Sequence, residues 1–471
     1  MWNGIIFCLI VFAAIVQFRE SAGLRALSIQ HLPVGGNDNI EQDGQGNRTI
    51  KSEGITTGRA STWQRLSEKQ LTTYFNSFEL AGLKNRSCGH FRELNDPWRW
   101  LGTSYKRPGP LPLIGTHNSG PCCVNGHTYG WFGVPLEDTM PLTMVEVTSE
   151  GVMVPPFQIQ SLLRSLRLEA RTVTDSTRHK QSIWIMGDST STQLFYGFLC
   201  AMVRIGAYVD HCSLSKESSG HYSHPLCDRM GTNYKQSLEN STAVDVTHSF
   251  AKLHYYPNGD HMPMELELHH FHDQHFCHNL PLKPKLQTFC KAHDSRFLNL
   301  ATSLDRPDLF LVNIGLHSSP QELRRRIQQL LGLLQPQFGS QLVWRETTVT
   351  HFPDLNQTGL YDNFMEELPK QNQSSSCGDV RFGSSQPRIM VSRKVLAETT
   401  PNLPILDMMD AETHLWQTYG GRNPKEKHLD CLHHVYTPLY YDSMFWRLAE
   451  IVRLRASATE HHHSKGLPIQ N

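Results

Sequence analysis

Residues 182–190 read SIWIMGDST and decide the fold of the chain. Residues 182–186 form a short apolar run, and Gly187 ends it. Beyond the turn, large apolar residues recur at helical spacing, at Leu194, Phe195, Phe198, Leu199, Met202 and Val203. The stretch therefore predicts a buried strand, a tight turn and a helix. Ligands of α/β proteins bind at the carboxyl ends of such strands, so this turn is a candidate site.

Further strand signals follow along the chain. Residues 308–314, 341–345 and 403–408 read as strands, and Thr437-Pro438 opens a closing helix. Strands that alternate with helical segments are typical of α/β proteins. The predicted fold class is therefore α/β.

One helix carries an explicit start signal. Ser319 suits the N-cap, Pro320 suits the first helical position, and Glu322 completes a capping box. We expect this helix to end near Leu334, before Pro336.

The pattern at the amino terminus predicts a targeting signal. Residues 5–18 are apolar, but the run is shorter than the roughly 20 residues that cross a bilayer, and it fits a signal-peptide core. Small residues at 21–23 offer a cleavage site, whereas no Lys or Arg precedes the run. Two predictions therefore stand: a cleaved signal peptide, or a signal anchor that attaches a type II protein to the membrane.

Cysteines and glycosylation sequons favour the secretory pathway. The chain has eleven Cys, of which one lies in the leader, and the even remainder is typical of disulfide-bonded domains. Reduced thiols in a cytosolic protein are the alternative. Sequons begin at Asn47, Asn85, Asn240, Asn356 and Asn372. We expect a protein of the Golgi lumen or the extracellular space.

Composition shifts divide the chain into regions. Residues 35–58 are rich in Gly, Asn, Asp and Gln and have too few apolar residues to form a core. The predicted regions are the signal peptide or anchor (1–23), a flexible stem (24–73), an irregular, disulfide-rich Cys/Trp lobe (74–150), an α/β domain that carries the candidate site (151–456) and a disordered tail (457–471).

The charge balance argues against one class of partner. Lys plus Arg and Asp plus Glu each number 44, so the formal net charge is zero. Such a chain has no global field to hold a polyanion, and we expect no nucleic-acid partner.

Ser189 stands at the predicted turn, where helix N–H groups can stabilise an oxyanion. A serine hydroxyl becomes a nucleophile when a base takes its proton and a third group holds that base. Asp430 and His433 are spaced so that one short loop can present both. His428 and His434 are rival bases, and a purely helix-capping role for the Gly-Asp-Ser turn is the alternative.

Asn313 is a third candidate. It ends an apolar strand, where its side-chain amide can donate to an oxyanion. A turn Asn before a glycine is the structural alternative.

These residues together resemble a known superfamily. The Gly-Asp-Ser run ending at Ser189, the Asn-x-Gly motif at Asn313 and the Asp-x-x-His pair ending at His433 occur in the order of SGNH/GDSL hydrolases. More narrowly, the chain looks like the PC-esterase and trichome-birefringence-like branch, which includes plant polysaccharide O-acetyltransferases. Residues 343–348 and 403–407 are similar to further segments of that branch.

The resemblance implies a flavodoxin-like, three-layer SGNH-type parallel sheet and a specific chemistry. Ser189 would be acylated, His433 held by Asp430 would be the base, and the Ser189 N–H and Asn313 would be the oxyanion donors. The implied activity is transfer of an O-acyl group, in this branch O-acetyl, from an acyl donor to a carbohydrate hydroxyl. It implies no cofactor and no metal.

Departures from the family pattern leave the substrate open. Thr192 stands where the plant-like motif has Arg, Gln193 where it has Asn, and His434 where it has Trp. The same triad can pass the acyl group to water, so an O-acetylesterase acting on a carbohydrate or another ester is the first alternative function. A non-catalytic extracellular glycan-binding protein is the second.

A dense histidine cluster follows residue 266. Closely spaced histidines are typical of metal-binding sites, but the spacing of these residues matches no known site. We therefore expect histidines that line a crevice or lie on the surface. The cluster comprises His269, His270, His272, His275 and His278.

Overall fold

A seven-stranded mixed sheet forms the core of the computed structural model. The chain divides into two units, Met1–Lys51 and Ser52–Asn471, and every residue described below belongs to the second. The structure describes residues 62–65, 144–155, 157–173, 180–205, 207–213, 248–257, 263–272, 297, 301, 303–314, 318–360, 377–378, 380–381, 386–413, 419–422, 429–434 and 438–464.

The strands of the sheet are ordered β4-β5-β6-β3-β7-β8-β9. Their bounds are β4 Tyr208–Ser213, β5 His248–Tyr255, β6 Met264–His272, β3 Lys180–Gly187, β7 Leu309–Val312, β8 Leu342–Arg345 and β9 Ile405–Leu406. From β6 to β9 every neighbouring pair is parallel, whereas β4, β5 and β6 pair antiparallel. The predicted α/β class is confirmed. The sheet is mixed rather than purely parallel because β4 and β5 extend one edge.

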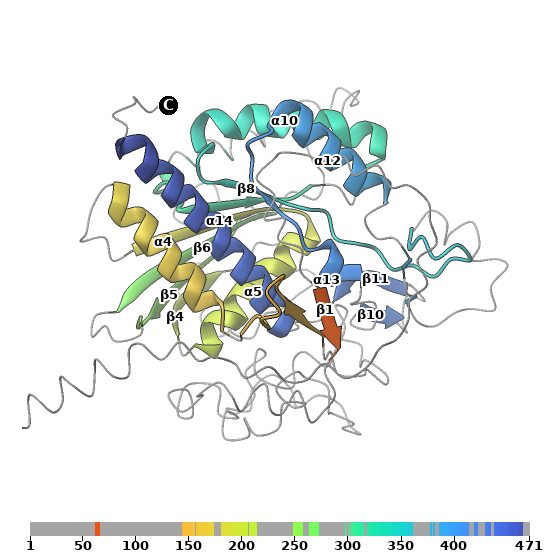
Figure 1. Ribbon diagram of the computed structural model, residues 1–471, viewed down its shortest axis with the longest axis horizontal. Coiled ribbons are helices and arrows are strands. Elements are labelled where there is room, and N and C mark those ends of the chain that lie inside the picture. The colour runs from red at the N-terminus through yellow and green to blue at the C-terminus, as the bar shows by residue number, and fades with distance from the viewer. Residues whose placement is uncertain are drawn as a thin grey trace, which may run out of the picture. The chain divides into compact units, whose positions relative to one another are not determined.

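Helices cover both faces of this sheet (Figure 1). One face carries α4 (Ile159–Val173), α5 (Ser189–Arg204) and α14 (Pro438–Ser464). The other face carries α10 (Pro320–Phe338) and α12 (Pro387–Thr399). The two faces bury separate apolar cores.

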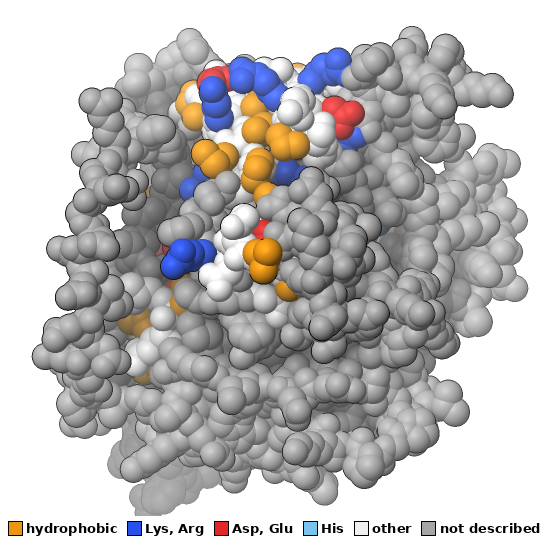
Figure 2. Space-filling model, turned by 90° about the vertical axis from the view of Figure 1, so that its right-hand side faces the viewer, with side chains coloured by type: hydrophobic (Ala, Val, Ile, Leu, Met, Phe, Trp, Pro, Cys, Tyr) orange, Lys and Arg blue, Asp and Glu red, His pale blue; other side chains and the backbone are white. Residues whose placement is uncertain are grey.

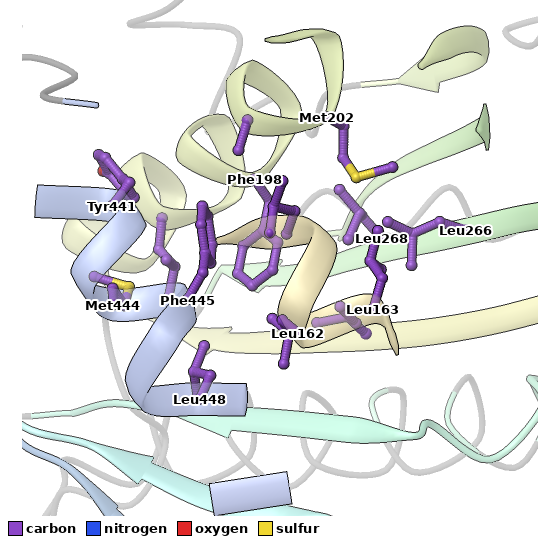
Figure 3. Packing of buried hydrophobic residues seen from close by; sticks show 14 of the residues in the cluster. Leu162, Leu163, Phe198, Met202, Leu266, Leu268, Tyr441, Met444, Phe445 and Leu448 are labelled. Carbon is purple, nitrogen blue, oxygen red and sulfur yellow. The ribbon is translucent and has the colours of Figure 1, made fainter. Parts of the chain in front are cut away.

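Successive side chains of β3 point alternately into the two cores. Ile183 and Ile185 pack on the α5 side, and Trp184 and Met186 pack on the α10 side. A strand buried on both faces must be apolar throughout, which explains the uninterrupted run in the sequence. Figure 3 shows the α5-side core, where side chains of α4, α5, β6 and α14 meet.

The capping box of α10 is confirmed. Ser319 is the N-cap, its hydroxyl accepts from the Glu322 N–H, and the Glu322 carboxylate accepts from the Ser319 N–H. The helix runs to Phe338, beyond the predicted end at Leu334. Phe338 packs against Trp184 and Phe310, and this burial stabilises the extra turn.

Regular secondary structure extends beyond two predicted boundaries. β1 (Thr62–Arg65) pairs antiparallel with β2 (Met144–Val147), so the predicted flexible stem contains a strand. Glu146 of β2 is fully buried and accepts hydrogen bonds from Arg447 of α14, which ties this pair to the helical layer. At the carboxyl end α14 continues to Ser464, so residues 457–464 are helical rather than a disordered tail.

The remaining short elements lie near the carboxyl end. They are α13 (Met409–Thr413), β10 (Tyr419–Arg422) and β11 (Leu429–His434), and β10 pairs antiparallel with β11. A disulfide joins Cys377 to Cys431, and Cys200 and Cys212 are also disulfide-bonded.

The leader and nearly all of the Cys/Trp lobe lie outside the described residues, so their predictions stay untested. Among the residues that are described, no helix combines the length and apolarity that crossing a membrane requires.

The outer surface over α10 and α12 carries both signs of charge. Basic, acidic and hydrophobic side chains are interspersed there, in the upper part of Figure 2. Arg324 of α10 forms an ion pair with Glu398 of α12, and the two side chains are 48% and 40% exposed.

Candidate active site

The Gly-Asp-Ser turn lies where the sheet topology favours a ligand site. β3 is the middle strand of the seven-stranded sheet. The next parallel strand in the chain, β6, lies on one side of it, and the following one, β7, lies on the other. Ligands of open α/β sheets bind at the carboxyl end of the strand where the order reverses in this way. That end of β3 is Gly187.

Gly187 is required by close packing. A Cβ atom at this position would lie 2.2 Å from Ser191 Oγ and 2.5 Å from the Asn313 carbonyl oxygen. The latter contact is with backbone, which cannot rotate away. The glycine therefore lets the start of α5 approach the end of β7.

Asp188 caps α5 from a fully buried position. Its Oδ1 accepts from the Thr190 N–H at 3.0 Å and from the Thr190 hydroxyl at 2.7 Å. Its carbonyl oxygen accepts from the N–H groups of Ser191 and Thr192. The predicted capping role is thus real, but it belongs to Asp188, and it leaves Ser189 as the first residue of the helix, half-buried.

A buried cation lies under this turn. Arg345, the last residue of β8, is 3% exposed and donates from Nη1 to the Thr190 hydroxyl at 3.1 Å. Its Nη2 donates to the Thr348 hydroxyl and lies 3.6 Å from Glu412 Oε1. Arg345 therefore links the residue after Ser189 to a buried carboxylate.

Glu412 completes this buried network. It accepts from the Val349 N–H at 2.9 Å and from the Tyr440 hydroxyl at 2.6 Å. Burial raises the pKa of the Glu412 carboxyl above 4.5, whereas Arg345 and the Tyr440 hydroxyl act to lower it. Burial, and next the Glu412 carboxyl, raise the pKa of Tyr440 well above 10, so the phenol stays a donor.

The sequence did not single out Arg345 and Glu412. Arg345 stands in the segment that resembles the family, and a cation at the end of an apolar strand was the available signal. Its partners Thr190 and Glu412 are 155 and 67 positions away in sequence, so only the fold identifies them.

Asn313 lies at the predicted strand end but with its donors occupied. Its Nδ2 donates to the carbonyl oxygens of Arg345 and Glu346, both at 2.9 Å. Its Oδ1 is buried and has no hydrogen-bond partner among the described residues. In this arrangement Asn313 fixes the end of β7 to the end of β8 and presents an acceptor, which does not suit an oxyanion. The expected donor role therefore requires the carboxamide to rearrange.

Asp430 and His433 lie in β11, not in the loop that the sequence predicted. Their side chains lie outside the described part of the structure. The backbone places them beside a register shift: Tyr419 pairs with His434 and Gly421 with Asp430, so Gly420 alone faces residues 431–433. Such bulges re-aim side chains and are over-represented next to active sites.

β11 is held close to α5. It lies against α5, its Cys431 carbonyl accepts from the His351 N–H at 2.9 Å, and the Cys377–Cys431 disulfide anchors it. The structure thus brings the backbone of the Asp430–His433 segment to the helix that Ser189 begins. The predicted contact between the Ser189 and His433 side chains is not tested by it.

The histidine cluster divides between the two faces of the sheet. On the α10 side, His248 Nε2 lies 3.1 Å from His269 Nδ1, and burial, followed by His269, lowers the pKa of His248 to about 3. On the α5 side, Thr192 Oγ1 lies 3.1 Å from His272 Nδ1 and 3.5 Å from His270 Nε2. Within the described residues, no group of three or more His, Cys, Asp or Glu could hold a metal ion. His275 and His278 lie outside those residues.

An ion-pair cluster closes the carboxyl edge of β8 and β9 on the α12 side. Arg393 donates to both carboxylate oxygens of Glu346, at 2.5 and 3.0 Å, and to Asp407 at 2.7 Å. Burial, and next the Asp407 carboxylate, raise the pKa of Glu346 to about 8, although the charge of Arg393 and its hydrogen bond act to lower it. This cluster holds α12 to the strand ends beside Asn313.

Comparison of the chain with protein-family models, with curated proteins and with solved structures finds no match.

Proposed function

We propose that this chain is a serine-dependent O-acyltransferase that moves an acyl group, most simply acetyl, from a donor to a carbohydrate hydroxyl. One observation carries the proposal. Ser189 is the first residue of a helix that follows a central parallel strand, at the point where the strand order reverses. That is where α/β proteins bind ligands.

The proposed chemistry uses four residues. Ser189 Oγ attacks the acyl carbonyl while His433 takes its proton, and Asp430 holds the imidazole in the productive tautomer. The bond between the acyl carbon and the donor's leaving group then breaks, and His433 gives the proton to that leaving group, which leaves an acyl-serine and a neutral imidazole. The Ser189 N–H at the helix terminus stabilises the oxyanion. We assign Asn313 a positioning role in the resting enzyme because its amide group already donates to the carbonyl oxygens of Arg345, the last residue of β8, and of Glu346, the residue after it.

In the second half of the reaction His433 activates a hydroxyl. The acyl group leaves Ser189 for the sugar oxygen, and the proton from that hydroxyl returns to Ser189 through His433. Water in place of the sugar would give hydrolysis, so the same residues serve an esterase. The order of the parallel strands, with β6-β3-β7-β8-β9 numbered 2-1-3-4-5 in chain order, supports the flavodoxin-like SGNH architecture that this proposal assumes.

The test uses the full-length chain with p-nitrophenyl acetate as donor and a neutral hexasaccharide as acceptor. We expect p-nitrophenol release and a new ester on the saccharide, both lost in Ser189→Ala. Free acetate without a saccharide ester assigns an esterase instead. Turnover that persists in Ser189→Ala contradicts the proposal, and saccharide retention without any turnover favours a glycan-binding protein.

A further inference from the structure

Residues 353–358 form a short loop that reverses the chain. Phe352 and Gly359 close it as an antiparallel bridge, and the Phe352 N–H donates to the Gly359 carbonyl oxygen at 3.1 Å. Inside the loop the Gln357 N–H donates to the Asp354 carbonyl oxygen at 3.1 Å, which closes a β-turn. Gln357 completes the reversal with a φ of 54°, in the left-handed region. The loop therefore has one compact backbone shape.

Side chains hold this loop on both sides of its tip. Asp354 is 9% exposed, its Oδ1 accepts from the Thr358 N–H at 2.7 Å, and its Oδ2 accepts from the Thr358 hydroxyl. Residues outside the loop hold it as well: the Arg381 N–H donates to the Gln357 carbonyl oxygen, and Gln386 Nε2 donates to the Thr358 carbonyl oxygen. These contacts fix the residues that flank the tip.

Asn356 lies at the tip, and the fold does not use its side chain. The residue is exposed, as are its neighbours Leu355 and Gln357. Within the described part of the chain, no hydrogen bond involves the Asn356 carboxamide. One of its two amide hydrogens can therefore be replaced without the loss of a contact.

The same residue begins an acceptor pattern for N-linked glycans. Asn356-Gln357-Thr358 is Asn-x-Thr without proline at the middle position. A bulky, hydrophilic glycan needs a surface position, which the exposed tip provides. The four other sequons of the chain lie outside the described residues, so this is the sequon whose surroundings the structure shows.

We infer that Asn356 carries an N-linked oligosaccharide. The inference rests on the expected passage through the secretory pathway and not on the chemistry of Ser189. The donor is an oligosaccharide joined through pyrophosphate to a lipid. Asn356 Nδ2 forms a bond to the anomeric carbon of the first sugar while the bond between that carbon and the pyrophosphate oxygen breaks. The lipid pyrophosphate leaves with the electron pair, and the amide nitrogen gives one proton to solvent.

The folded loop also indicates when this transfer takes place. The pattern requires a hydroxyl at its third position, which Thr358 supplies. In the fold that hydroxyl is half-buried and donates to Asp354. A transferase that recognises the hydroxyl must therefore meet it before the loop closes. The transfer precedes folding of the loop, and the closed loop then presents the glycan at the surface.

The test is peptide mass spectrometry of the full-length chain made in a secreting eukaryotic cell. Samples are compared before and after treatment with peptide N-glycosidase, which converts a glycosylated Asn to Asp. Asn402 is the internal control for spontaneous deamidation, because it is an exposed turn residue outside any sequon.

Four variants separate the sequon from the shape of the loop. Asn356→Gln removes the acceptor, and Thr358→Val removes the hydroxyl that the pattern requires. Thr358→Ser keeps both the pattern and the hydroxyl. Asp354→Ala keeps the pattern but removes the carboxylate that holds the folded loop.

We expect residue 356 of the wild-type chain to be read as Asp after the enzyme treatment, while Asn402 stays Asn. The glycan should be lost in Asn356→Gln and Thr358→Val and retained in Thr358→Ser and Asp354→Ala. An unmodified Asn356 in the wild-type chain overturns the inference, whether or not other sequons are occupied, and so does equal conversion of Asn402. Loss of the glycan in Asp354→Ala would show that the transfer needs the closed loop, which overturns the proposed order of transfer and folding.

Discussion

Replacement of Arg345 by Met should destabilise the fold and do so increasingly as pH rises. Methionine keeps the length of the side chain but removes the charge that faces Glu412. The Arg345 Nη2 to Glu412 Oε1 distance is 3.6 Å, and both side chains are 3% exposed. At an effective dielectric constant of about 20 that separation corresponds to about 4–5 kcal/mol of attraction.

The net cost should be about 3–5 kcal/mol, as is usual when one member of a buried ion pair is removed. The pH dependence follows from Glu412, whose pKa burial already raises above 4.5. Without Arg345 that pKa rises further, so between 4.5 and the raised value the folded state binds more protons than the unfolded state. The unfolding free energy of the variant then falls as pH rises through this window, and the difference from the wild-type chain is smallest near pH 4.5.

Urea unfolding of the variant at about pH 5 and about pH 8 measures both effects. Arg345→Met with Glu412→Gln removes the uncompensated charge and should recover much of the loss at the higher pH. Arg324→Met, which breaks the exposed pair with Glu398, should cost under about 1 kcal/mol. A loss of that small size in Arg345→Met, or one that is equal at both pH values, would refute the reasoning.

Three further outcomes follow from the structure. Gly187→Ala should lower ester turnover at least tenfold and cost about 1–3 kcal/mol in urea unfolding, because the new Cβ lies 2.2 Å from Ser191 Oγ; wild-type activity would contradict this. Cys377→Ser with Cys431→Ser opens a loop of 54 residues and should lower the unfolding free energy by about 4 kcal/mol. Ester turnover should fall as well. An unchanged unfolding free energy together with unchanged turnover would show that β11 does not need the disulfide as an anchor. Ser319→Ala removes the cap of α10 and should lower the unfolding free energy by about 1 kcal/mol, measured by thermal or urea unfolding, while ester turnover stays unaltered. A loss of turnover would show that Ser319 does more than cap this helix.

The sequence predicted those elements whose stabilising contacts join residues that are close together in the chain. The run at residues 182–190 contains both a strand buried on two faces and the glycine that a close approach requires. The capping box at Ser319 likewise contains its donor and acceptor within four residues. The residues next to each other in the chain are enough to identify such elements, and the sequence predicted these two correctly.

Elements defined by distant partners were not predictable in this way. The Asp430–His433 segment was expected to be a loop, but it pairs with β10, whose Tyr-Gly-Gly-Arg sequence carries weak strand signals. Asn313 was placed at the correct strand end, but its hydrogen bonds depend on two carbonyl groups at the carboxyl end of β8 and just beyond it, 32 and 33 positions away. The sequence proposed the candidate residues, and the fold was needed to show that the amide group of Asn313 already donates to backbone carbonyls.

The central claim is that Ser189 is acylated, and rapid quenching tests it most directly. The full-length chain is mixed with p-nitrophenyl acetate, stopped in acid during the first turnovers, and digested for peptide mass spectrometry. We expect one acetyl group on the peptide that contains Ser189, formed as p-nitrophenol appears and absent in Ser189→Ala. Turnover with no acetyl group on Ser189, or with the acetyl group on another residue, would contradict it.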